Sequence, residues 1–239
     1  MTTKSTENTL SKEIQEMFNA GAHFGFSKAR RHPTFKPFIF GVKNGTEILN
    51  LEVTEGFLKK ALEFVAKIAS EKKTILFVGS KSEVRDVVRA AALAIDMPYV
   101  SDRWIGGTLT NFDQMKKRVA RLDDLQAQKE KGELTRYTKK ERLLLDREIQ
   151  KLIRFFEGVR GMSKLPDALF VVDAKKEHIA IAEAKKMHIP VISLSSTDCD
   201  LSTIDFPIPA NDSARTSVDY FVKAISDIYK KESQAVKKA

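Results

Sequence analysis

The fold of this chain is organised around the ten residues 103–112, which read RWIGGTLTNF. They contain the only tryptophan and the only Gly-Gly pair of the sequence. They follow a predicted strand that ends near Val100, and they lead into a long, charged helical pattern. Because an open α/β sheet presents its working loops at strand ends, this stretch is a candidate functional loop. The alternative is a tight turn above a packed Trp104, since adjacent glycines allow a sharp bend of the backbone.

Composition indicates a soluble protein with an anionic partner. The 239 residues are 42% hydrophobic, enough for one or two domains with a real core. The formal charge of +9 favours nucleic acid over a membrane surface as partner. Cys199 is the only cysteine, which excludes a disulfide within the chain and fits a reducing compartment. Residues 1–8 lack the apolar run of a signal peptide, and no apolar run approaches the roughly 20 residues of a membrane span. We therefore expect a cytoplasmic protein with no membrane contact.

Short apolar runs alternate with helical periodicity along most of the chain. This order is typical of right-handed βαβ crossovers and of a parallel sheet with helices on both faces. The predicted strands are 46–50, 74–78, 98–100, 167–173 and 190–194, and the predicted helices between them are 54–70, 82–95 and 176–187.

The two ends of the chain add further elements. We expect residues 1–9 and the tail 237–238 to be loosely held, with a helix over 11–20 that stops at Gly21. Asn44-Gly45 between the apolar runs 38–42 and 46–50 predicts a β-hairpin. Residues 206–209 can form only an edge strand, because their two prolines lack ladder donors. A last helix is predicted over 211–231.

Residues 102–164 interrupt the α/β order. Helical patterns over 111–131 and 138–159, joined by a short connection, predict an antiparallel helical hairpin. Thr138 and Glu141 have the spacing of a capping box. The segment carries 16 basic and 10 acidic residues, so it is either a solvated projecting arm or a binding surface. We predict an α/β domain made of 1–101 and 165–239, with 102–164 as an inserted helical hairpin.

Residues 21–45 are strongly basic, with five cations and no acidic side chain. Phenylalanines are interleaved with the cations, a pattern that suits RNA, because phosphates attract cations and bases can stack on rings. The alternative is a solvated basic loop whose phenylalanines fill the core. We predict RNA contacts for Lys28, Arg30 and Arg31.

No nucleotide-hydrolysing, metalloprotease or hydrolase motif occurs, and no catalytic constellation can be assembled. The segment 79–82 follows a strand and opens a helix, so its amides could hold a phosphate. Asp173, Asp198 and Asp200 could gather at strand ends and bind Mg²⁺, or they could cap loops. The competing function is therefore a magnesium-dependent phosphoryl-transfer or receiver-like protein that uses Asp173 and Asp198.

Seven segments in the same order resemble the S-two family of small-subunit ribosomal proteins, in its bacterial or organellar form. The resemblance covers about residues 10 to 230, and the stretch 103–112 is its most specific part. The matching segments are 21–25, 37–41, 77–81, 103–112, 165–173, 183–184 and 189–191.

The resemblance implies a flavodoxin-like three-layer α/β domain with an inserted helical hairpin. It also implies a structural, non-catalytic protein that binds small-subunit rRNA and helps to hold the mRNA-binding S-one protein. No cofactor, no metal and no homo-oligomer are expected. With neutralisation of phosphates as the mechanism, the predicted RNA contacts are Lys28, Arg30, Arg31, Lys36, Lys81 and Arg103, supported by Lys116, Arg118 and Arg121. Trp104, Gly106 and Gly107 are predicted to shape the loop.

Overall fold

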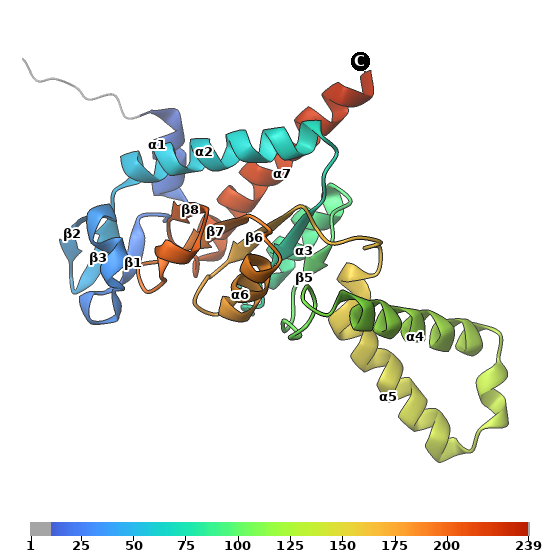
Figure 1. The fold of residues 1–239 in the computed structure, drawn as a ribbon. Coiled ribbons are helices and arrows are strands. Elements are labelled where there is room, and N and C mark those ends of the chain that lie inside the picture. The colour runs from blue at the N-terminus through green and yellow to red at the C-terminus, as the bar shows by residue number, and fades with distance from the viewer. Residues whose placement is uncertain (1–10, 239) are drawn as a thin grey trace, which may run out of the picture.

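A five-stranded parallel sheet forms the centre of the computed structural model, which describes residues 11–238 (Figure 1). The strand order is β5-β4-β6-β7-β8, the order of flavodoxin-like folds. The predicted flavodoxin-like α/β fold is confirmed, whereas the expectation for residues 1–9 lies outside the described residues. The strands are β4 (Ile75–Val78), β5 (Tyr99–Val100), β6 (Ala168–Val172), β7 (Val191–Ser195) and β8 (Phe206–Pro209).

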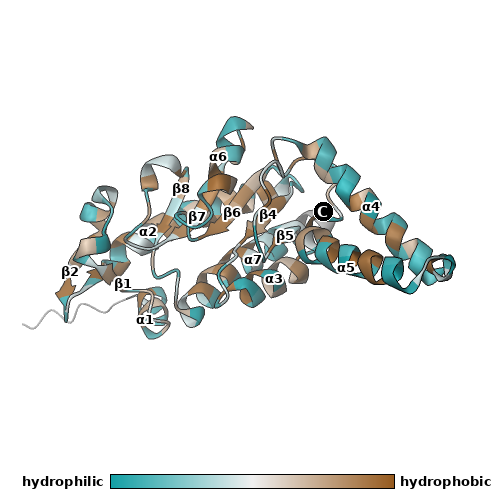
Figure 2. Cartoon of the chain, turned by 90° about the horizontal axis from the view of Figure 1, so that it is seen from below, coloured by the Kyte–Doolittle hydropathy of each residue, from teal (hydrophilic) through white to brown (hydrophobic). Residues whose placement is uncertain are grey.

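Alternation of side chains along the strands creates two cores, one on each face of the sheet. Ile75 and Phe77 belong to the core under four helices, and Leu76 and Val78 belong to the core on the opposite face. Figure 2 shows the apolar strands between layers of amphipathic helices. The first core is covered by α1 (Lys12–Asn19), α2 (Leu51–Ser70), α3 (Arg85–Ala94) and α7 (Arg215–Lys238), and the second by α6 (His178–Lys186) and residues 103–112.

Strand β8 is an edge strand, as its prolines predict. It pairs in parallel with β7, and the amide of Ala210 donates to Ser195 O at 3.1 Å. Amides of successive residues point to opposite sides of a strand, so Pro207 and Pro209 occupy positions that face away from β7. Beyond this strand, α7 continues past its predicted end near Lys231 to Lys238.

A separate three-stranded antiparallel sheet lies at one end of the molecule (Figure 1). Its order is β1 (Phe24–Ser27), β3 (Thr46–Leu49), β2 (Ile39–Lys43). The predicted hairpin is confirmed, with Asn44 and Gly45 both at positive φ. The assignment of 46–50 to the parallel sheet is wrong, because the two-residue turn returns the chain directly alongside β2. Short helices η1 (Lys28–Arg30) and η2 (Pro33–Phe38) join β1 to β2.

Helices α4 (Phe112–Glu130) and α5 (Lys139–Phe156) extend away from the sheet, with η3 (Glu133–Arg136) between them. We call residues 112–156 the α4–α5 arm. The predicted capping box at Thr138 is present. The division of the chain into an α/β domain and an inserted hairpin stays a prediction. The two helices contact each other through Leu122, Leu125, Ile149 and Leu152, flanked by the ion pairs Arg121–Glu148 and Lys129–Asp146.

Within residues 11–238, no helix combines the length and the apolar character that a bilayer crossing requires.

Candidate nucleic-acid interface and the filled ligand crevice

We call residues 103–112 the apical loop. This loop folds around the carboxylate of Glu183, a residue of α6. Its Oε1 accepts the indole N–H of Trp104 at 3.1 Å and the backbone N–H of Gly107 at 2.7 Å. Its Oε2 accepts the N–H of Leu109 at 3.0 Å. The amide and the hydroxyl of Thr110 also donate to Oε2, each at 3.1 Å. Five donors from one loop therefore converge on a single side chain.

Glu183 remains charged although it is only 7% exposed. Burial alone raises the pKa of this carboxyl, but the amides of Thr110 and Gly107 and the Trp104 indole outweigh burial and lower the pKa overall. An ionised carboxylate without such donors would be strongly unfavourable in this position. The shape of the apical loop thus depends on a buried negative charge.

The two glycines of the apical loop differ in their surroundings. Gly107 has φ +92°, and a Cβ there would lie 3.3 Å from the Cβ of Asn111, so a side chain would be strained. Gly106 is exposed, and a Cβ there would meet nothing within 4 Å. Trp104 is buried in the second core together with Leu109.

Lys81 lies in a largely buried ionic cluster with Asp173, Asp212 and Ser213, which we call the Lys81 cluster. Its ammonium is 2.8 Å from Asp173 Oδ2 and 2.9 Å from Asp212 Oδ1, and it donates to Ser213 Oγ at 3.1 Å. Burial alone would lower the pKa of Lys81, but Asp212 and Asp173 outweigh it and raise the pKa. The cation is therefore retained, and it is already neutralised. This placement argues against the predicted contact of Lys81 with an RNA phosphate.

The ligand crevice of a sheet with this order lies between the carboxyl ends of β4 and β6, where the strand order reverses. Here the residues that follow these two strands fill it. The Glu177 carboxylate accepts the amide of Ser80 at 3.1 Å and also its hydroxyl. Lys176 Nζ donates to Ser80 O at 3.0 Å. A carboxylate of the chain itself thus binds the amide predicted to hold a phosphate.

The three aspartates of the alternative magnesium site have separate structural roles. Asp173 accepts the amides of Lys175 and Lys176 at 3.1 and 3.0 Å. Asp198 pairs with Lys175 Nζ at 3.1 Å. Asp200 accepts the amide of Ser202 at 2.9 Å and begins η5 (Leu201–Thr203). Asp173 and Asp200 therefore cap loops, the alternative weighed from the sequence, whereas Asp198 forms an ion pair.

One set of potential metal ligands converges among the described residues, namely Asp173, Cys199 and Asp212. The Lys81 ammonium contacts both of these carboxylates, which places a cation of the chain at that point. Burial raises the pKa of the Cys199 thiol, which disfavours the thiolate that would bind a metal. The donor set therefore fits an ammonium rather than a metal ion.

The remaining predicted RNA contacts fall into two groups. Arg31 is largely buried and pairs with the fully buried Glu47 at 2.9 Å, so its charge is already neutralised. Arg121 is exposed but pairs with Glu148 at 3.2 Å. The others are exposed and have no ion-pair partner among the described side chains: Lys28, Arg30, Lys36, Arg103, Lys116 and Arg118.

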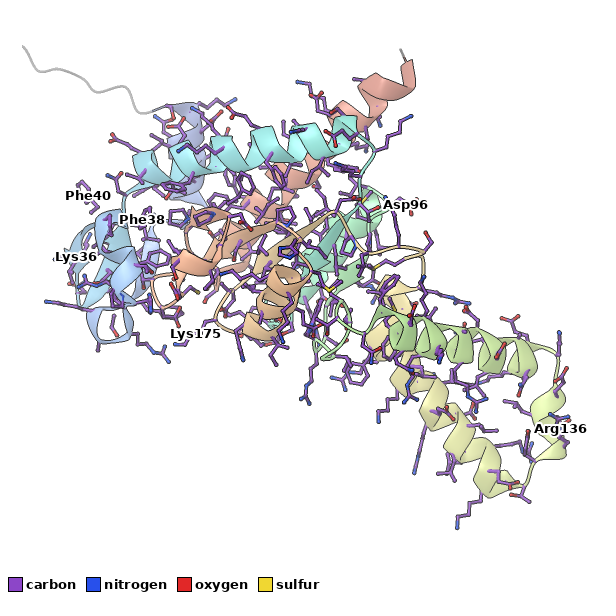
Figure 3. All side chains as sticks on the ribbon, viewed as in Figure 1. Lys36, Phe38, Phe40, Asp96, Arg136 and Lys175 are labelled. Carbon is purple, nitrogen blue, oxygen red and sulfur yellow. The ribbon has the colours of Figure 1, made fainter. Side chains whose placement is uncertain are left out.

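The free cations occupy distant parts of the molecule. Figure 3 places Lys36 beside the three-stranded sheet, whereas Lys116 and Arg118 lie on α4 at the base of the α4–α5 arm. Two of the free cations lie over aromatic rings: Arg30 over Phe26 at 5.2 Å, and Lys116 over Phe112 at 4.6 Å. Such stacking holds a cation in place without neutralising it.

The sequence prediction missed Glu183 and Glu177 as organising residues. In α6 the spacing of Ala180, Glu183 and Ala184 places the carboxylate on the buried face. A charged residue on an apolar helix face needs a hydrogen-bonding or charged partner. This position of Glu183 in the helical pattern could have identified it from the sequence.

These features define a flavodoxin-like α/β protein whose ligand crevice is filled by its own side chains and whose free cations lie outside it. A magnesium-dependent phosphoryl-transfer or receiver-like protein is not favoured. The family model described as Ribosomal protein S2 matches residues 17–231. The chain therefore belongs to the ribosomal protein S2 family.

Relatives confirm this assignment over most of the chain. The small ribosomal subunit protein uS2 of Chlorobaculum tepidum is 42% identical over 215 residues, which are 90% of this chain and 86% of the relative. The protein of the same name from Sulfurimonas denitrificans is 42% identical over 214 residues, with 90% and 83% covered. That from Nocardia farcinica is 42% identical over 222 residues, with 93% and 78% covered.

Proposed function

We propose that this chain is a structural component of the small ribosomal subunit, located on cytoplasmic ribosomes, that binds small-subunit rRNA and catalyses no reaction. Its relatives are named small ribosomal subunit proteins, and members of the family are generally structural. The observation that carries the proposal is the contrast between the filled crevice and the free cations outside it. A protein of this kind neutralises phosphates at its surface and needs no enclosed site.

The RNA contacts we propose are the six predicted cations that are exposed and have no ion-pair partner among the described side chains. Lys28, Arg30 and Lys36 form one group near the three-stranded sheet, and Arg103, Lys116 and Arg118 form another at the apical loop and the base of α4. Arg121 is a weaker candidate because of its pair with Glu148. Arg31 and Lys81 stabilise the fold in this proposal. The apical loop, which contains Trp104, Gly106 and Gly107 and is held by Glu183, sets the position of Arg103.

We also propose contacts with neighbouring small-subunit proteins, including the S-one protein. Three phenylalanines support a protein contact near the three-stranded sheet: Phe18 is 58% exposed, Phe24 48% and Phe40 78%. Figure 3 shows Phe40 at the outer end of this region. Exposed aromatic rings of this size are typical of protein-binding surfaces.

The proposal is tested by sedimentation of a tagged chain from a gently prepared lysate, followed by crosslinking to identify the bound RNA. We expect the chain in fractions that contain small subunits or their precursors, crosslinked to small-subunit rRNA. Charge reversal at Arg30, Lys36 and Arg103 should move it to lighter fractions. A wild-type chain found wholly apart from ribosomal particles would overturn the proposal.

A further inference from the structure

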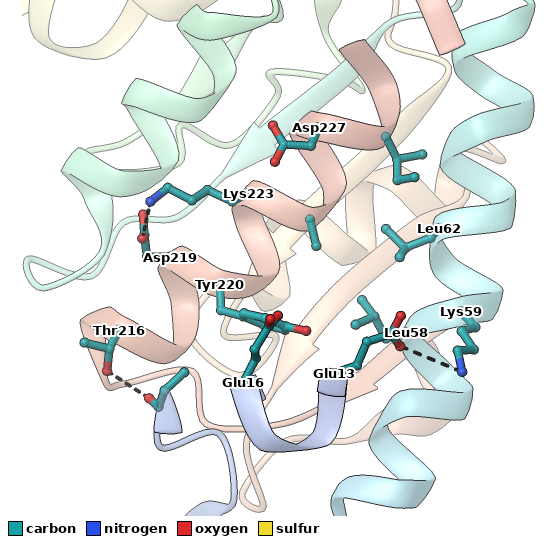
Figure 4. Close-up of a pocket in the computed structure, with 13 residues that line it drawn as sticks. Glu13, Glu16, Leu58, Lys59, Leu62, Thr216, Asp219, Tyr220, Lys223 and Asp227 are labelled. Atoms are coloured by element: carbon teal, nitrogen blue, oxygen red, sulfur yellow. Dashed lines mark hydrogen bonds and ion pairs between the residues drawn. The ribbon is translucent and has the colours of Figure 1, made fainter. Parts of the chain in front are cut away.

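A groove between α1, α2 and α7 is not used by the proposed RNA contacts (Figure 4). Its volume is about 640 Å³. Leu58 and Leu62 of α2 line one side, and Tyr220 and Ile228 of α7 line the other. Leu62, Tyr220 and Ile228 are only partly buried, so the groove presents apolar surface to the outside. The groove lies on the side of the sheet opposite to the apical loop.

Four carboxylates surround this apolar surface: Glu13 and Glu16 from α1, and Asp219 and Asp227 from α7. Two lysines also lie at the rim, and both are neutralised within the protein. Lys59 Nζ is 2.7 Å from Glu55 and 3.8 Å from Glu13, and Lys223 Nζ is 2.7 Å from Asp219.

Glu16 and Asp227 give the groove its negative charge, because the other two carboxylates are paired with lysines. Among the described side chains, the only ion pair of Glu16 is with the exposed Lys12 at 3.8 Å, and Asp227 has none. Burial raises the pKa of the Tyr220 hydroxyl, and the nearby carboxylates of Glu16, Glu13 and Glu55 raise it further. In a chain with a net charge of +9, this surface has the opposite sign to the rest.

A negative rim disfavours RNA, because phosphates would approach carboxylates. It favours a partner that combines apolar side chains with cations. Helices α2 and α7 lie side by side and run in the same direction, since Thr54 of α2 bonds to Pro209 O just before α7 and Tyr229 of α7 bonds to Lys73 O just after α2. The shallow apolar floor between them is suited to receive an amphipathic helix or extended segment.

We propose that this groove binds a lysine- or arginine-rich amphipathic segment of a partner protein. Apolar side chains of that segment would pack on Leu62 and Ile228, and its cations would meet Glu16 and Asp227. This surface goes beyond the proposed function and does not depend on the RNA contacts, because it lies on another face and has the opposite charge.

The test uses the full chain and two labelled peptides designed as amphipathic helices, one of leucine and lysine and one of leucine and glutamate. Binding is measured by fluorescence anisotropy, and the site is mapped by crosslinking. We expect the basic peptide to bind and to crosslink to α1 and α7. The double variant Glu16→Lys, Asp227→Lys should weaken binding about tenfold.

The matched control is the double variant Asp124→Lys, Glu130→Lys, which makes the same charge change on exposed positions of α4. It should leave the affinity within about twofold of wild type. Ala224→Phe, which fills the groove, should weaken the basic peptide without lowering the melting temperature. Equal binding of the acidic peptide, displacement by oligouridylate RNA, or self-association of the chain through the groove would each overturn the proposal.

Discussion

The indole N–H of Trp104 donates to the carboxylate of Glu183 at 3.1 Å, across 79 positions of the chain. This bond joins the apical loop to α6, and four further donors of the loop reach the same carboxylate. The only tryptophan of the chain therefore reports directly on the group that shapes the loop. The first two predictions below use this relationship.

Replacement of Glu183 by glutamine should destabilise the protein without changing the size of the side chain. An amide has one acceptor oxygen instead of two, and its NH₂ group would face N–H donors. We expect the free energy of unfolding to fall by about 3 kcal/mol. Urea unfolding followed by Trp104 fluorescence measures the change. Glu130→Gln, at an exposed position of α4, is the control and should change it by less than about 0.5 kcal/mol.

The stability contributed by the Glu183 charge should depend on pH in a defined direction. The folded pKa lies below the ordinary value of 4.5, so the contribution is fully present above that value and is lost as the pH falls through the folded pKa. The difference in unfolding free energy between wild type and Glu183→Gln should therefore be constant from neutral pH to about pH 4.5 and shrink below it. Unfolding curves across this range test it, and a difference that already declines near neutral pH would contradict it.

Lys81→Met should be strongly destabilising, because it leaves Asp173 and Asp212 buried beside each other without their shared cation. We expect a loss of about 3–5 kcal/mol in unfolding free energy. Adding Asp212→Asn should restore part of the loss, since it removes one of the two unpaired charges. Thermal and urea unfolding of the single and double variants measure this. A loss no larger than that of an exposed lysine would show that the Lys81 cluster contributes little.

Gly158 and Gly161 offer a matched pair of substitutions near strand β5. A Cβ at Gly158 would collide with the backbone oxygen of Tyr99, whereas a Cβ at Gly161 would meet nothing within 4 Å. Gly158→Ala should therefore lower the melting temperature by several degrees, about 1–3 kcal/mol in stability. Gly161→Ala should leave it nearly unchanged. Similar melting temperatures for the two variants would show that residues near η4 (Glu157–Val159) shift easily.

The RNA contacts predict a change in salt dependence. Replacing Lys28, Arg30 and Lys36 by alanine should remove up to three phosphate contacts, so the slope of log affinity against log salt should become shallower by about 2–3. Filter binding to a small-subunit rRNA fragment at several salt concentrations measures the slope. The control replaces Lys60, Lys67 and Lys230, exposed cations of α2 and α7. Equal slopes for both variants would indicate attraction by net charge alone.

The sequence predicted most of the parallel sheet because strands buried on both faces read as short apolar runs. The runs at 74–78 and 167–173 lie within a residue or two of β4 and β6. Strand β1 was missed because FGFS is only four residues long and contains a glycine, a residue type that is depleted in strands. Strand β3 was assigned to the parallel sheet because a predicted helix and strand follow it, although the Asn44-Gly45 turn already pairs it with β2.

The site was harder to predict because charge counts do not show which acids the fold brings to a cation. Lys81 meets Asp212 across 131 positions, and Arg31 meets Glu47 of β3 across 16 positions. Both cations look available in the sequence and are neutralised in the structure. Exposed cations such as Lys28 and Lys36 were predictable, since no acidic residue occurs between 21 and 45.

The prolines of β8 affect how the newly folded protein can associate with other copies. Pro207 and Pro209 have no backbone N–H donor on the outer edge of the sheet. A strand of another chain therefore cannot readily pair with β8. At the opposite edge, β5 has only two residues and is packed against η4. A newly synthesised copy is thereby guarded against stacking edge to edge with its neighbours into insoluble aggregates.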